Sequence, residues 1–490
     1  MPEIILAIDQ GTTGSTAVLV DRDLRIYGSV NEEYPQHYPH AGWVEHDPED
    51  IWRSVESVVR KVLARTRVNV ADIAVIGITN QRETVVGWEA QSGKPIHNAV
   101  VWQCRRTADV CKKLKDEGLE PLFQKRTGLV LDPYFSGTKI AWILDHVEGA
   151  RDRLDDLRFG TIDSFLVSRL TQGEVHVTDV SNASRTLLMN LASCTWDEEL
   201  AKHLRVPLQV MPEIRSSSEV YGRTKGLSFL PDGIPIAGIA GDQQAALFGQ
   251  TCFDVGEAKC TYGTGAFMLM NVGHTPKVSA NGLLSTAAWR IGDKTTYALE
   301  GSAFVAGAIV QWLRDGLGII SSSKEVEELA RSVPDSNGVV LVPALAGLGA
   351  PHWNPQARGV IWGLTAGVTR AHVARAALEG IAFQCHDILK AMEEDVGAPL
   401  QVLRIDGGAA ANNLLMQFQA DLLEVEISRP EVLETTALGA ALLAGLGVGF
   451  FDGLEDIRRI WREELRFTPA MDDETRTAHL DRWRAGIARV

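Results

Sequence analysis

A short motif occurs twice in this sequence, once in each half, and it limits the folds that the chain can adopt. Residues 5–21 read ILAIDQGTTGSTAVLVD, and residues 257–273 read EAKCTYGTGAFMLMNVG. Each segment predicts an apolar strand, a turn of glycine and threonine, and a second apolar strand. We interpret the pair as a duplication, and a chance match over so few residues is the alternative.

The segments around the first motif alternate between strands and helices up to about residue 250. Residues 48–66 predict a helix with Asp47 as its N-cap, and residues 73–80 predict a buried strand. We expect 84–89 and 99–102 to extend the same sheet. This alternation is typical of the α/β class. With the duplication, it predicts two lobes, residues 1–250 and 251–490, that face each other across a cleft.

Length, charge and cysteine spacing exclude several classes of protein. A chain of 490 residues is too long for one ordinary core. A net charge of −15 argues against a nucleic-acid partner. The six cysteines show neither disulfide nor metal-ligand spacing, which fits a reducing cytoplasm. The N-terminus does not read as a signal peptide, and the apolar run 437–451 predicts a buried helix and a loop instead of a membrane span.

Both glycine-threonine turns are candidate phosphate-binding loops. In the first, Gly11 and Gly14 allow a tight turn with outward N–H groups, to which Thr12, Thr13 and Ser15 would add hydroxyl donors. Asp9 at the strand end is a candidate Mg²⁺ ligand. The second loop is YGTGAF, residues 262–267. An ordinary hairpin turn is the alternative for either loop alone, but two such loops would grip a polyphosphate from both sides.

A third glycine-rich turn follows a predicted strand at 403–406. Gly407 and Gly408 would let a flat ligand approach the backbone, and the Asn412-Asn413 pair could donate to an adenine or ribose. A tight turn with asparagine as a helix cap is the alternative. The chain has no GxxxxGK[ST], no GxGxxG and no HRD or DFG, which excludes Walker-type, Rossmann and protein-kinase sites.

Polar residues at other strand ends are candidates for a small hydroxylated ligand. Arg82 and Glu83 follow the strand 73–80, Trp102 ends another segment, and Tyr134 lies on a loop. A structural salt bridge and ordinary packing are the alternatives. Asp242 ends a run of small residues, where it is a general base, the N-cap of the next helix, or both.

These segments together resemble the FGGY carbohydrate kinases, and in particular their glycerol-specific members. The resemblance runs from about residue 4 to residue 490 and rests on DQGTTGST, NQRET, VWQCRRT, DPYFSGTK, AGDQQAALFGQ, TYGTGAF, QWLRD, IDGGAAANN and the segment 359–380. It implies two duplicated lobes of the RNase H-like, actin-like ATPase type. It also implies ATP-dependent phosphorylation of glycerol to sn-glycerol 3-phosphate, with Mg²⁺, in the cytoplasm, by a dimer or tetramer.

The resemblance also implies a role for each matched residue. Asp242 would be the base that accepts the proton of the attacking hydroxyl, and Asp9 would serve Mg²⁺. Glycerol would be bound by Arg82, Glu83, Trp102, Tyr134, Asp242, Gln243 and Phe267. ATP would be bound by Thr12, Thr13, Ser15, Thr264, Gly307, Gln311, Gly408 and Asn412.

The chain departs from the family pattern in three places. The family often has Arg where this chain has Thr16, next to the ADP phosphates. Residues 225–238 lack both the Gly-Gly-x-Arg loop that binds fructose 1,6-bisphosphate in some bacterial members and the histidine that others have phosphorylated. Neither form of regulation is therefore expected here.

Two other functions are kept as alternatives. One is a kinase for a different polyol or sugar. The other is an actin-like ATPase without small-molecule kinase activity, which would have no need of the Arg82–Glu83–Trp102–Tyr134 cluster. The helices expected around 377–383 and 435–445 are rich in Ala and Gly. They would suit either a hinge between the lobes or plain close packing.

Overall fold

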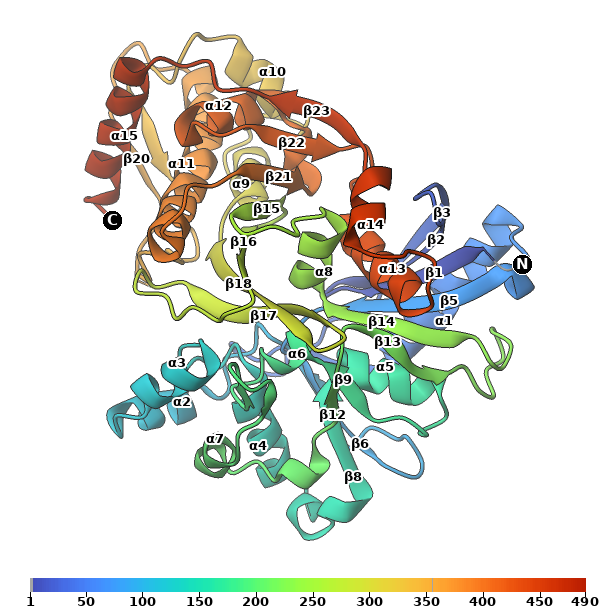
Figure 1. The fold of residues 1–490 in the computed structure, drawn as a ribbon. Helices are drawn as coiled ribbons and strands as arrows, with labels where there is room; N and C mark the ends of the chain where they lie inside the picture. Colours follow the sequence, from blue (N-terminus) through green and yellow to red (C-terminus); the bar gives the residue numbers. More distant parts are fainter. Residues whose placement is uncertain (1–2, 355) are drawn as a thin grey trace.

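The computed structural model describes residues 3–354 and 356–490, and it is built around one long mixed sheet with helices on both faces (Figure 1). The sheet has thirteen strands in the order β23-β22-β21-β15-β16-β18-β17-β13-β14-β5-β1-β2-β3 among these residues. Its strands are β1 Ile4–Gln10, β2 Gly14–Asp21, β3 Ile26–Glu33, β5 Ile73–Asn80, β13 Ser218–Arg223, β14 Pro235–Gly241, β15 Glu257–Tyr262, β16 Ala266–Gly273, β17 Leu284–Ile291, β18 Lys294–Ala303, β21 Val402–Asp406, β22 Ile427–Pro430 and β23 Glu463–Phe467.

The order of these strands confirms the predicted duplication. In the first unit, β14, β5 and β1 are parallel neighbours, and β2 and β3 follow in antiparallel pairing. In the second unit, β22, β21 and β15 are parallel neighbours, and β16 and β18 follow in antiparallel pairing. The two units therefore repeat one topology, and each contains one glycine-threonine hairpin. A single pair, Ser218 opposite Ile291, links β13 to β17 between them.

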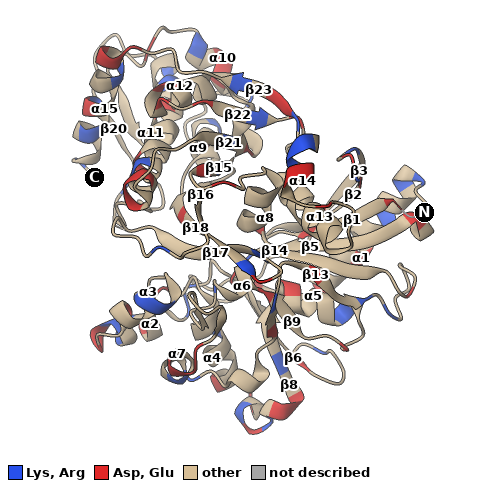
Figure 2. Ribbon diagram, in the orientation of Figure 1, with Lys and Arg blue, Asp and Glu red and all other residues tan. Residues whose placement is uncertain are grey.

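Fifteen helices are found among the described residues, and several of them, α1, α8, α11 and α13 above all, cover the faces of the sheet. They are α1 Pro48–Thr66, α2 Ala108–Asp116, α3 Glu120–Thr127, α4 Ser136–His146, α5 Ile162–Leu170, α6 Val180–Ala183, α7 Glu198–Leu204, α8 Asp242–Gly249, α9 Gly307–Asp315, α10 Glu325–Arg331, α11 Arg370–Val396, α12 Asn413–Leu423, α13 Thr435–Gly447, α14 Leu454–Ile460 and α15 Asp473–Ile487. On outer helices such as α10, α14 and α15, acidic and basic residues are interspersed (Figure 2). No helix of the described residues has the length and hydropathy that crossing a membrane requires.

The first helix and the first hairpin form as predicted. The Asp47 side chain accepts a hydrogen bond from the backbone N–H of Glu49, and α1 then buries an apolar stripe against β2 and β3. In the hairpin, Leu6 pairs with Leu19 and Ile8 with Ala17, all fully buried. Strands covered on both faces read as continuous apolar runs, which is why β1 and β5 are easy to recognise.

The prediction that 84–89 and 99–102 extend the main sheet is wrong. Strands β6 Val85–Glu89 and β7 Ala99–Val100 belong to a separate four-stranded sheet with β4 Glu45–His46 and β8 Leu157–Thr161. Between β5 and β6, Glu83 has a φ of 61°, in the left-handed region. The chain therefore turns out of the main sheet at Arg82 and Glu83, and an apolar pattern alone does not say which sheet a strand joins.

Six further strands in the described part of the chain are short. They are β9 Val177–Asp179, β10 Met189–Asn190, β11 Thr195–Trp196, β12 Glu213–Arg215, β19 Val340–Val342 and β20 Val360–Trp362.

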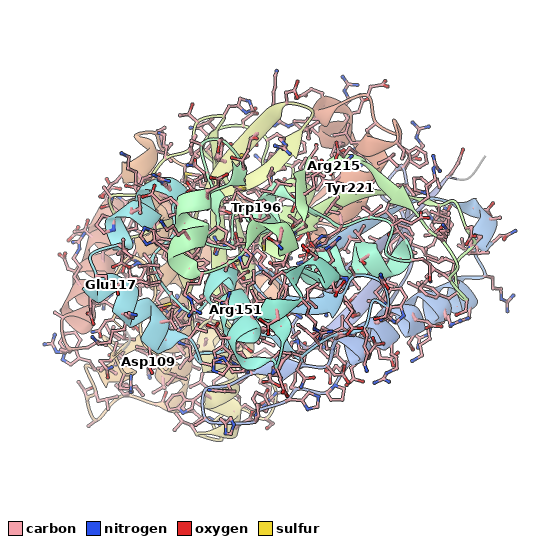
Figure 3. The ribbon with its side chains drawn as sticks, turned by 90° about the horizontal axis from the view of Figure 1, so that it is seen from below. Asp109, Glu117, Arg151, Trp196, Arg215 and Tyr221 are labelled. Atoms are coloured by element: carbon pink, nitrogen blue, oxygen red, sulfur yellow. The ribbon has the colours of Figure 1, made fainter. Side chains whose placement is uncertain are left out.

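Figure 3 views the molecule from below, where Trp196, Arg215 and Tyr221 are labelled. The Trp196 indole donates to the Pro212 carbonyl at 2.8 Å, and the Arg215 guanidinium lies 6.0 Å from the centre of the Tyr221 ring.

Helix α13 lies far along the chain but packs on the first unit, against α8, β1, β5 and β14 (Figure 1). The approach is very close. A Cβ atom at Gly439 would lie 1.8 Å from the Ala245 carbonyl oxygen, and one at Gly77 would lie 2.2 Å from the Ala440 carbonyl oxygen. In α11, a Cβ at Gly380 would lie 2.3 Å from the Leu341 carbonyl oxygen. Both small-residue helices are thus closely packed, and their role as a hinge stays a prediction.

We expect Gly439→Ala to lower the free energy of unfolding by about 2 kcal/mol, because the new methyl group meets backbone that cannot move away. Gly453→Ala is the matched control. It precedes α14, its φ of 170° is extended, and a Cβ there meets nothing within 4 Å. Urea unfolding measures both variants, and equal midpoints would contradict the close contact between α13 and α8.

Candidate active site

The carboxyl ends of three neighbouring parallel strands meet at one edge of the first unit. Asn80 at the end of β5 pairs with Gln10 of β1 on one side and with Gly241 of β14 on the other. The register therefore brings together Asp9, the Arg82-Glu83 turn and Asp242. Burial, together with the nearby charge of Asp242, raises the pKa of Asp9 to about 7.

Asp242 is not the N-cap of the helix that follows it. Gly241 holds that position, and Asp242 is the first residue of α8. Its side chain, 29% exposed, places Oδ1 3.2 Å from the Arg82 Nε atom and accepts from the N–H of Gln243 at 2.7 Å. The carboxylate thus faces the strand-end edge, which removes the helix-cap alternative.

Arg82 belongs to a buried cluster of four charged residues, which we call the charge cluster: Arg82, Glu83, Arg185 and Glu300. Arg82 Nη1 and Nη2 both donate to the Glu300 carboxylate, the second at 3.1 Å. Arg185 Nη2 donates to Glu300 at 3.0 Å, and its Nε donates to Glu83 at 2.7 Å. All four side chains are at most 2% exposed.

The two carboxylates of the charge cluster differ in their pKa. Burial alone would raise the pKa of Glu300, but the charges of Arg185 and Arg82 and the hydrogen bond from Arg82 lower it to about 2. At Glu83 burial dominates, and the two guanidinium groups offset it only in part, so that its pKa is raised. Glu300 is thus the fixed anion that holds both arginines.

Sequence reasoning missed Arg185 and Glu300. Glu300 comes from β18 in the second unit, whereas Arg82 and Glu83 follow β5 in the first. A glutamate inside the apolar strand segment YALEGSA was a usable signal, because a lone charge in a buried strand needs a partner. Arg185 follows α6 and carries no such signal.

Tyr134 and Trp102 lie beside the charge cluster, and their contact with glycerol stays a prediction. Their rings meet edge to face with centroids 5.6 Å apart. The Tyr134 hydroxyl lies 3.4 Å from Arg82 Nη2, and the Trp102 indole donates to the Thr12 hydroxyl at 2.9 Å. The aromatic pair thus connects the charge cluster to the first glycine-threonine loop.

The first loop is held in place by the polar side chains of Tyr34, which is buried, and Gln36, which is partly buried. The Tyr34 hydroxyl lies 2.6 and 2.8 Å from the carbonyl oxygens of Gly11 and Thr12 and can donate to either, and Gln36 donates to Thr12 as well. Thr13 is exposed, but Ser15 is fully buried and shares a hydrogen bond with Ser54 of α1 at 2.7 Å. The Ser15 hydroxyl is therefore engaged inside the protein. Thr16, which stands where the family often has Arg, accepts a hydrogen bond from the Asn31 side chain at 2.9 Å.

The second and third glycine-rich turns lie side by side in the second unit. The N–H of Gly307, at the start of α9, donates to Gly263 at 2.9 Å, and the carbonyl of Thr264 accepts from Ala306 at 2.8 Å. Gly407 has a φ of 85°, and a Cβ there would lie 2.6 Å from the Tyr262 carbonyl oxygen.

The remaining predicted residues lie around these two turns. Gln311 on α9 and Gly408 are exposed, and Phe267 is partly exposed in β16 opposite Thr261 of β15. Asn412 accepts from the N–H of Leu415 at 3.0 Å, so it is the N-cap of α12. Its cap role, the alternative of the sequence analysis, is what the structure shows, and contact with a nucleotide stays a prediction.

The chemistry of the strand-end edge fits a magnesium ion shared with phosphate groups. Among the described residues, no group of three His, Cys, Asp or Glu side chains could hold a metal ion by itself. Asp9 and Asp242 lie close enough for their charges to interact. One or two carboxylates that leave the other positions to water and phosphate oxygens are the donor set that Mg²⁺ prefers.

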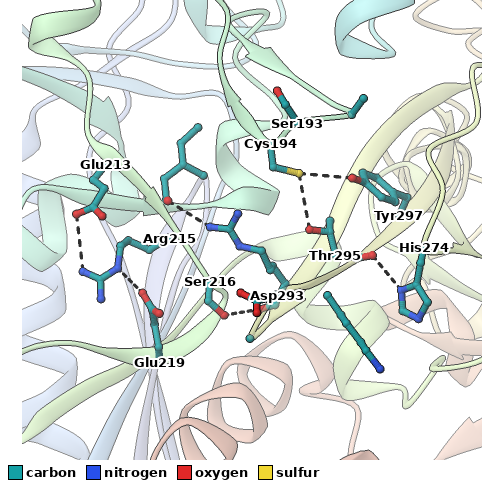
Figure 4. Close-up of a pocket in the computed structure, with 15 residues that line it drawn as sticks. Ser193, Cys194, Glu213, Arg215, Ser216, Glu219, His274, Asp293, Thr295 and Tyr297 are labelled. Carbon is teal, nitrogen blue, oxygen red and sulfur yellow. Dashed lines mark hydrogen bonds and ion pairs between the residues drawn. The ribbon is translucent and has the colours of Figure 1, made fainter.

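A cavity of about 660 Å³ lies elsewhere, between residues 213–219 and the β17–β18 turn (Figure 4). It is lined by Arg215, Arg290, Lys294 and His274, with three acidic residues among them. Glu219 and Glu213 already engage Arg215. None of the predicted site residues lines this cavity, so the strand-end edge stays the candidate active site.

We expect Glu300→Gln to lower the free energy of unfolding by about 3 kcal/mol, because it leaves two buried guanidinium groups without their shared anion. Urea unfolding followed by circular dichroism measures the loss. Asp116→Asn is the control, since it removes an exposed ion pair with Lys112 and should leave the urea midpoint unchanged. Equal midpoints for the two variants would show that the charge cluster contributes nothing to stability.

The sequence matches known proteins along almost its whole length. Residues 4–249 match the N-terminal domain of the FGGY family of carbohydrate kinases, and residues 258–448 match the C-terminal domain of that family. A glycerol kinase of Myxococcus xanthus is 56% identical over 490 residues, which is 99% of each chain. A glycerol kinase of Trichlorobacter lovleyi is 58% identical over 487 residues, 99% of this chain and 98% of the relative.

Solved structures agree with this match. The crystal structure of Plasmodium falciparum glycerol kinase with ADP superposes with a TM-score of 0.94 at 38% identity, over 99% of this chain and 98% of that one. A ligand-bound xylulose kinase from Lactobacillus acidophilus superposes with a TM-score of 0.89 at 22% identity, over 99% of this chain and 97% of that one, a likeness of fold alone. The α/β fold is therefore the two-lobed, actin-like ATPase fold, and the chain belongs to the FGGY family of carbohydrate kinases.

Proposed function

We propose that this protein transfers the γ-phosphoryl group of ATP to glycerol and forms sn-glycerol 3-phosphate. One observation carries the proposal: glycerol kinases are its relatives at 54–58% identity over nearly the full chain. The charge cluster, the Trp102–Tyr134 pair and Asp242 lie together at one strand-end edge, and this geometry supports a pocket for a small polyol.

In the proposed reaction, Asp242 is the general base. The attacking hydroxyl gives its proton to the Asp242 carboxylate while its oxygen bonds to the γ-phosphorus. The bond from that phosphorus to the bridging oxygen breaks, and ADP leaves with the electron pair. Arg82, fixed by Glu300, holds the Asp242 carboxylate 3.2 Å from its Nε atom and so orients the base. Such positioning is most of what phosphoryl transfer asks of a protein.

Glycerol would lie against the aromatic pair. In this proposal the Trp102 and Phe267 rings wall its carbon atoms, and Arg82, Glu83, Tyr134 and Gln243 bind its hydroxyl groups. Both guanidinium groups of the charge cluster are held by carboxylates, which leaves the polar edge of the pocket with a fixed geometry. A site with fixed donors and acceptors favours a substrate whose hydroxyl groups match them.

ATP would lie between the two glycine-threonine loops. Thr12 and Thr13 from the first loop and Thr264 from the second would contact its phosphate groups. The Ser15 hydroxyl, which the family resemblance assigns to ATP, shares a hydrogen bond with Ser54 and would have to leave it to reach a phosphate. Gly307, Gln311, Gly408 and Asn412 would line the adenosine pocket. Mg²⁺, held by Asp9 and the phosphates, would supply positive charge that offsets the charge on the transferred group.

The proposal also covers the lobes, the assembly and the compartment. We keep residues 1–250 and 251–490 as the two lobes, and a dimer or tetramer as the assembly. Six free, buried cysteines support a reducing compartment such as the cytoplasm. A kinase for another polyol or sugar is the second candidate, supported by the fold that the chain shares with a xylulose kinase.

The proposal is tested by ADP release with Mg-ATP and glycerol, compared with xylulose, ribulose, erythritol and dihydroxyacetone. We expect strong, selective turnover with glycerol. Asp242→Asn should keep its thermal midpoint and its affinity for glycerol but lose about a hundredfold or more in kcat, because the base is gone. Turnover with another acceptor alone would overturn the proposed substrate.

Asp254→Asn is the matched control for the base. Asp254 lies just beyond the same helix and is 68% exposed at the side chain. Its variant should retain the kcat of the parent protein. An Asp242→Asn variant with the kcat of this control would remove the assigned role of Asp242.

A buried lysine, Lys139 of α4, holds two residues of the proposed glycerol pocket. Its ammonium donates to the carbonyl oxygens of Glu83, at 3.2 Å, and Tyr134. Burial lowers the pKa of Lys139 to about 8, although the charge of Glu83 opposes the shift. The ammonium is therefore charged below that pH and neutral above it, and a neutral amine makes weaker hydrogen bonds.

We expect the KM for glycerol to rise about threefold between pH 7 and pH 9.5 as Lys139 loses its charge. Lys139→Met should show a raised KM that is flat over this range. The pKa of the neighbouring Cys111 thiol is raised to about 12, outside the window. Steady-state kinetics at five pH values measure this, and an equal slope in the variant would assign the titration to another group.

A further inference from the structure

A second buried lysine, Lys259, lies beneath the proposed site and has no role in the function described so far. It is in the middle of β15 and is fully buried. Its Nζ atom donates to the Gln243 Oε1 atom and, at 2.8 Å, to the Thr261 hydroxyl. It thus connects the residue after Asp242 in the first unit to the strand that leads into the second glycine-threonine loop.

The surroundings of Lys259 favour a role in positioning. Among the described residues no carboxylate lies within ion-pair distance of Nζ, so its hydrogen bonds go to neutral oxygens. Burial lowers the pKa of Lys259, while the charges of Asp406 and Asp242 partly oppose that shift. A buried ammonium is costly unless its hydrogen bonds are well made, which ties the Gln243 amide firmly to it.

This contact decides which end of the Gln243 amide faces the site. An ammonium group only donates, so it must receive the amide oxygen and never the NH₂ group. Nε2 of Gln243 has no partner among the described residues, and the side chain is partly exposed. The amide therefore offers two N–H donors beside Asp242, whose Oδ1 accepts from the backbone N–H of the same glutamine.

We propose that Lys259 is a positioning residue that fixes the Gln243 amide so that it donates hydrogen bonds to a hydroxyl oxygen of the polyol. The inference rests on the proposed function, because it needs a polyol at Gln243. In this arrangement a substrate hydroxyl gives its proton to Asp242, and a substrate hydroxyl oxygen accepts a hydrogen bond from Gln243. One of the two neighbouring residues thus acts as acceptor and the other as donor toward the hydroxyl groups. A lysine that only balanced charge would leave the amide free to rotate.

A double-mutant cycle separates positioning from charge balance. Lys259→Met and Gln243→Ala should each raise the KM for glycerol by about tenfold, the size of one lost hydrogen bond, with the KM for ATP within about twofold of wild type. The double variant should be no worse than either single one, since both remove the same interaction. Effects that multiply would overturn the inference. Lys294→Met, an exposed lysine at the β17–β18 turn, is the control and should leave both constants unchanged.

A second variant covers the case in which Lys259→Met does not fold. Gln243→Glu keeps the shape and can pair with Lys259, but it removes both amide donors. It should raise the KM for glycerol at least as much as Gln243→Ala, with an unchanged KM for ATP. A Gln243→Glu protein with the wild-type KM would also overturn the inference.

Crystal structures of the wild type and of Lys259→Met, or of Gln243→Glu if the former does not fold, give a readout that does not depend on turnover. We expect Gln243 to turn its amide oxygen to Lys259 in the wild type and to leave that position in Lys259→Met. The carboxylate that Gln243→Glu introduces should stay paired with the lysine.

Glycerol turnover tests the proposed function, and the orientation of Gln243 in the crystal structures tests the inference about Lys259. If the wild type phosphorylates glycerol but Gln243 keeps its position without Lys259, the inference fails and the proposed function stands. If the wild type does not phosphorylate glycerol, the proposed function fails, and the orientation of Gln243 still decides whether Lys259 fixes it.

Discussion

The carboxylate of Glu300 receives both buried arginines, and the positions of the charge cluster and of Asp242 depend on this one anion. It stands on β18 of the second unit and holds Arg82, which follows β5 of the first unit, and Arg185, which follows α6. A buried charge without its partner is very unfavourable, so these groups have little freedom to move apart. Since Arg82 in turn holds Asp242, the position of the proposed base is set by a residue from the opposite unit.

Several residues of the proposed site have a structural role beside the functional role that we propose for them. Arg82 and Glu83 form the buried salt-bridge network that was the alternative to ligand binding, and they still adjoin Tyr134 and Asp242. Asn412 caps a helix at the edge of the third turn. A group that is already held by its neighbours loses little freedom when a ligand binds, so the two explanations support each other.

Local sequence patterns predicted the helices and strands of this fold well, whereas contacts between elements that are distant in sequence could not be predicted from them. The two hairpins, α1, β5 and the three glycine-rich turns are visible as apolar periods, caps and glycines, because the chain itself dictates them. The separate sheet of β6 and β7 depends on the turn at Glu83, and the roles of Glu300 and Lys259 depend on strands far apart in sequence. Ser15 shows the same limit within a motif, because its hydroxyl faces Ser54 of α1.

The packing of α13 on the first unit has a consequence for synthesis on the ribosome. The first unit ends its own strands at Gly241, but the helix that covers β5 and β14 begins only at Thr435. At roughly 5–20 residues per second, about ten to forty seconds pass before that helix is made. During this time the apolar face that α13 will cover is open to other chains. The nascent protein therefore carries an uncovered apolar face on its first unit until translation is almost complete.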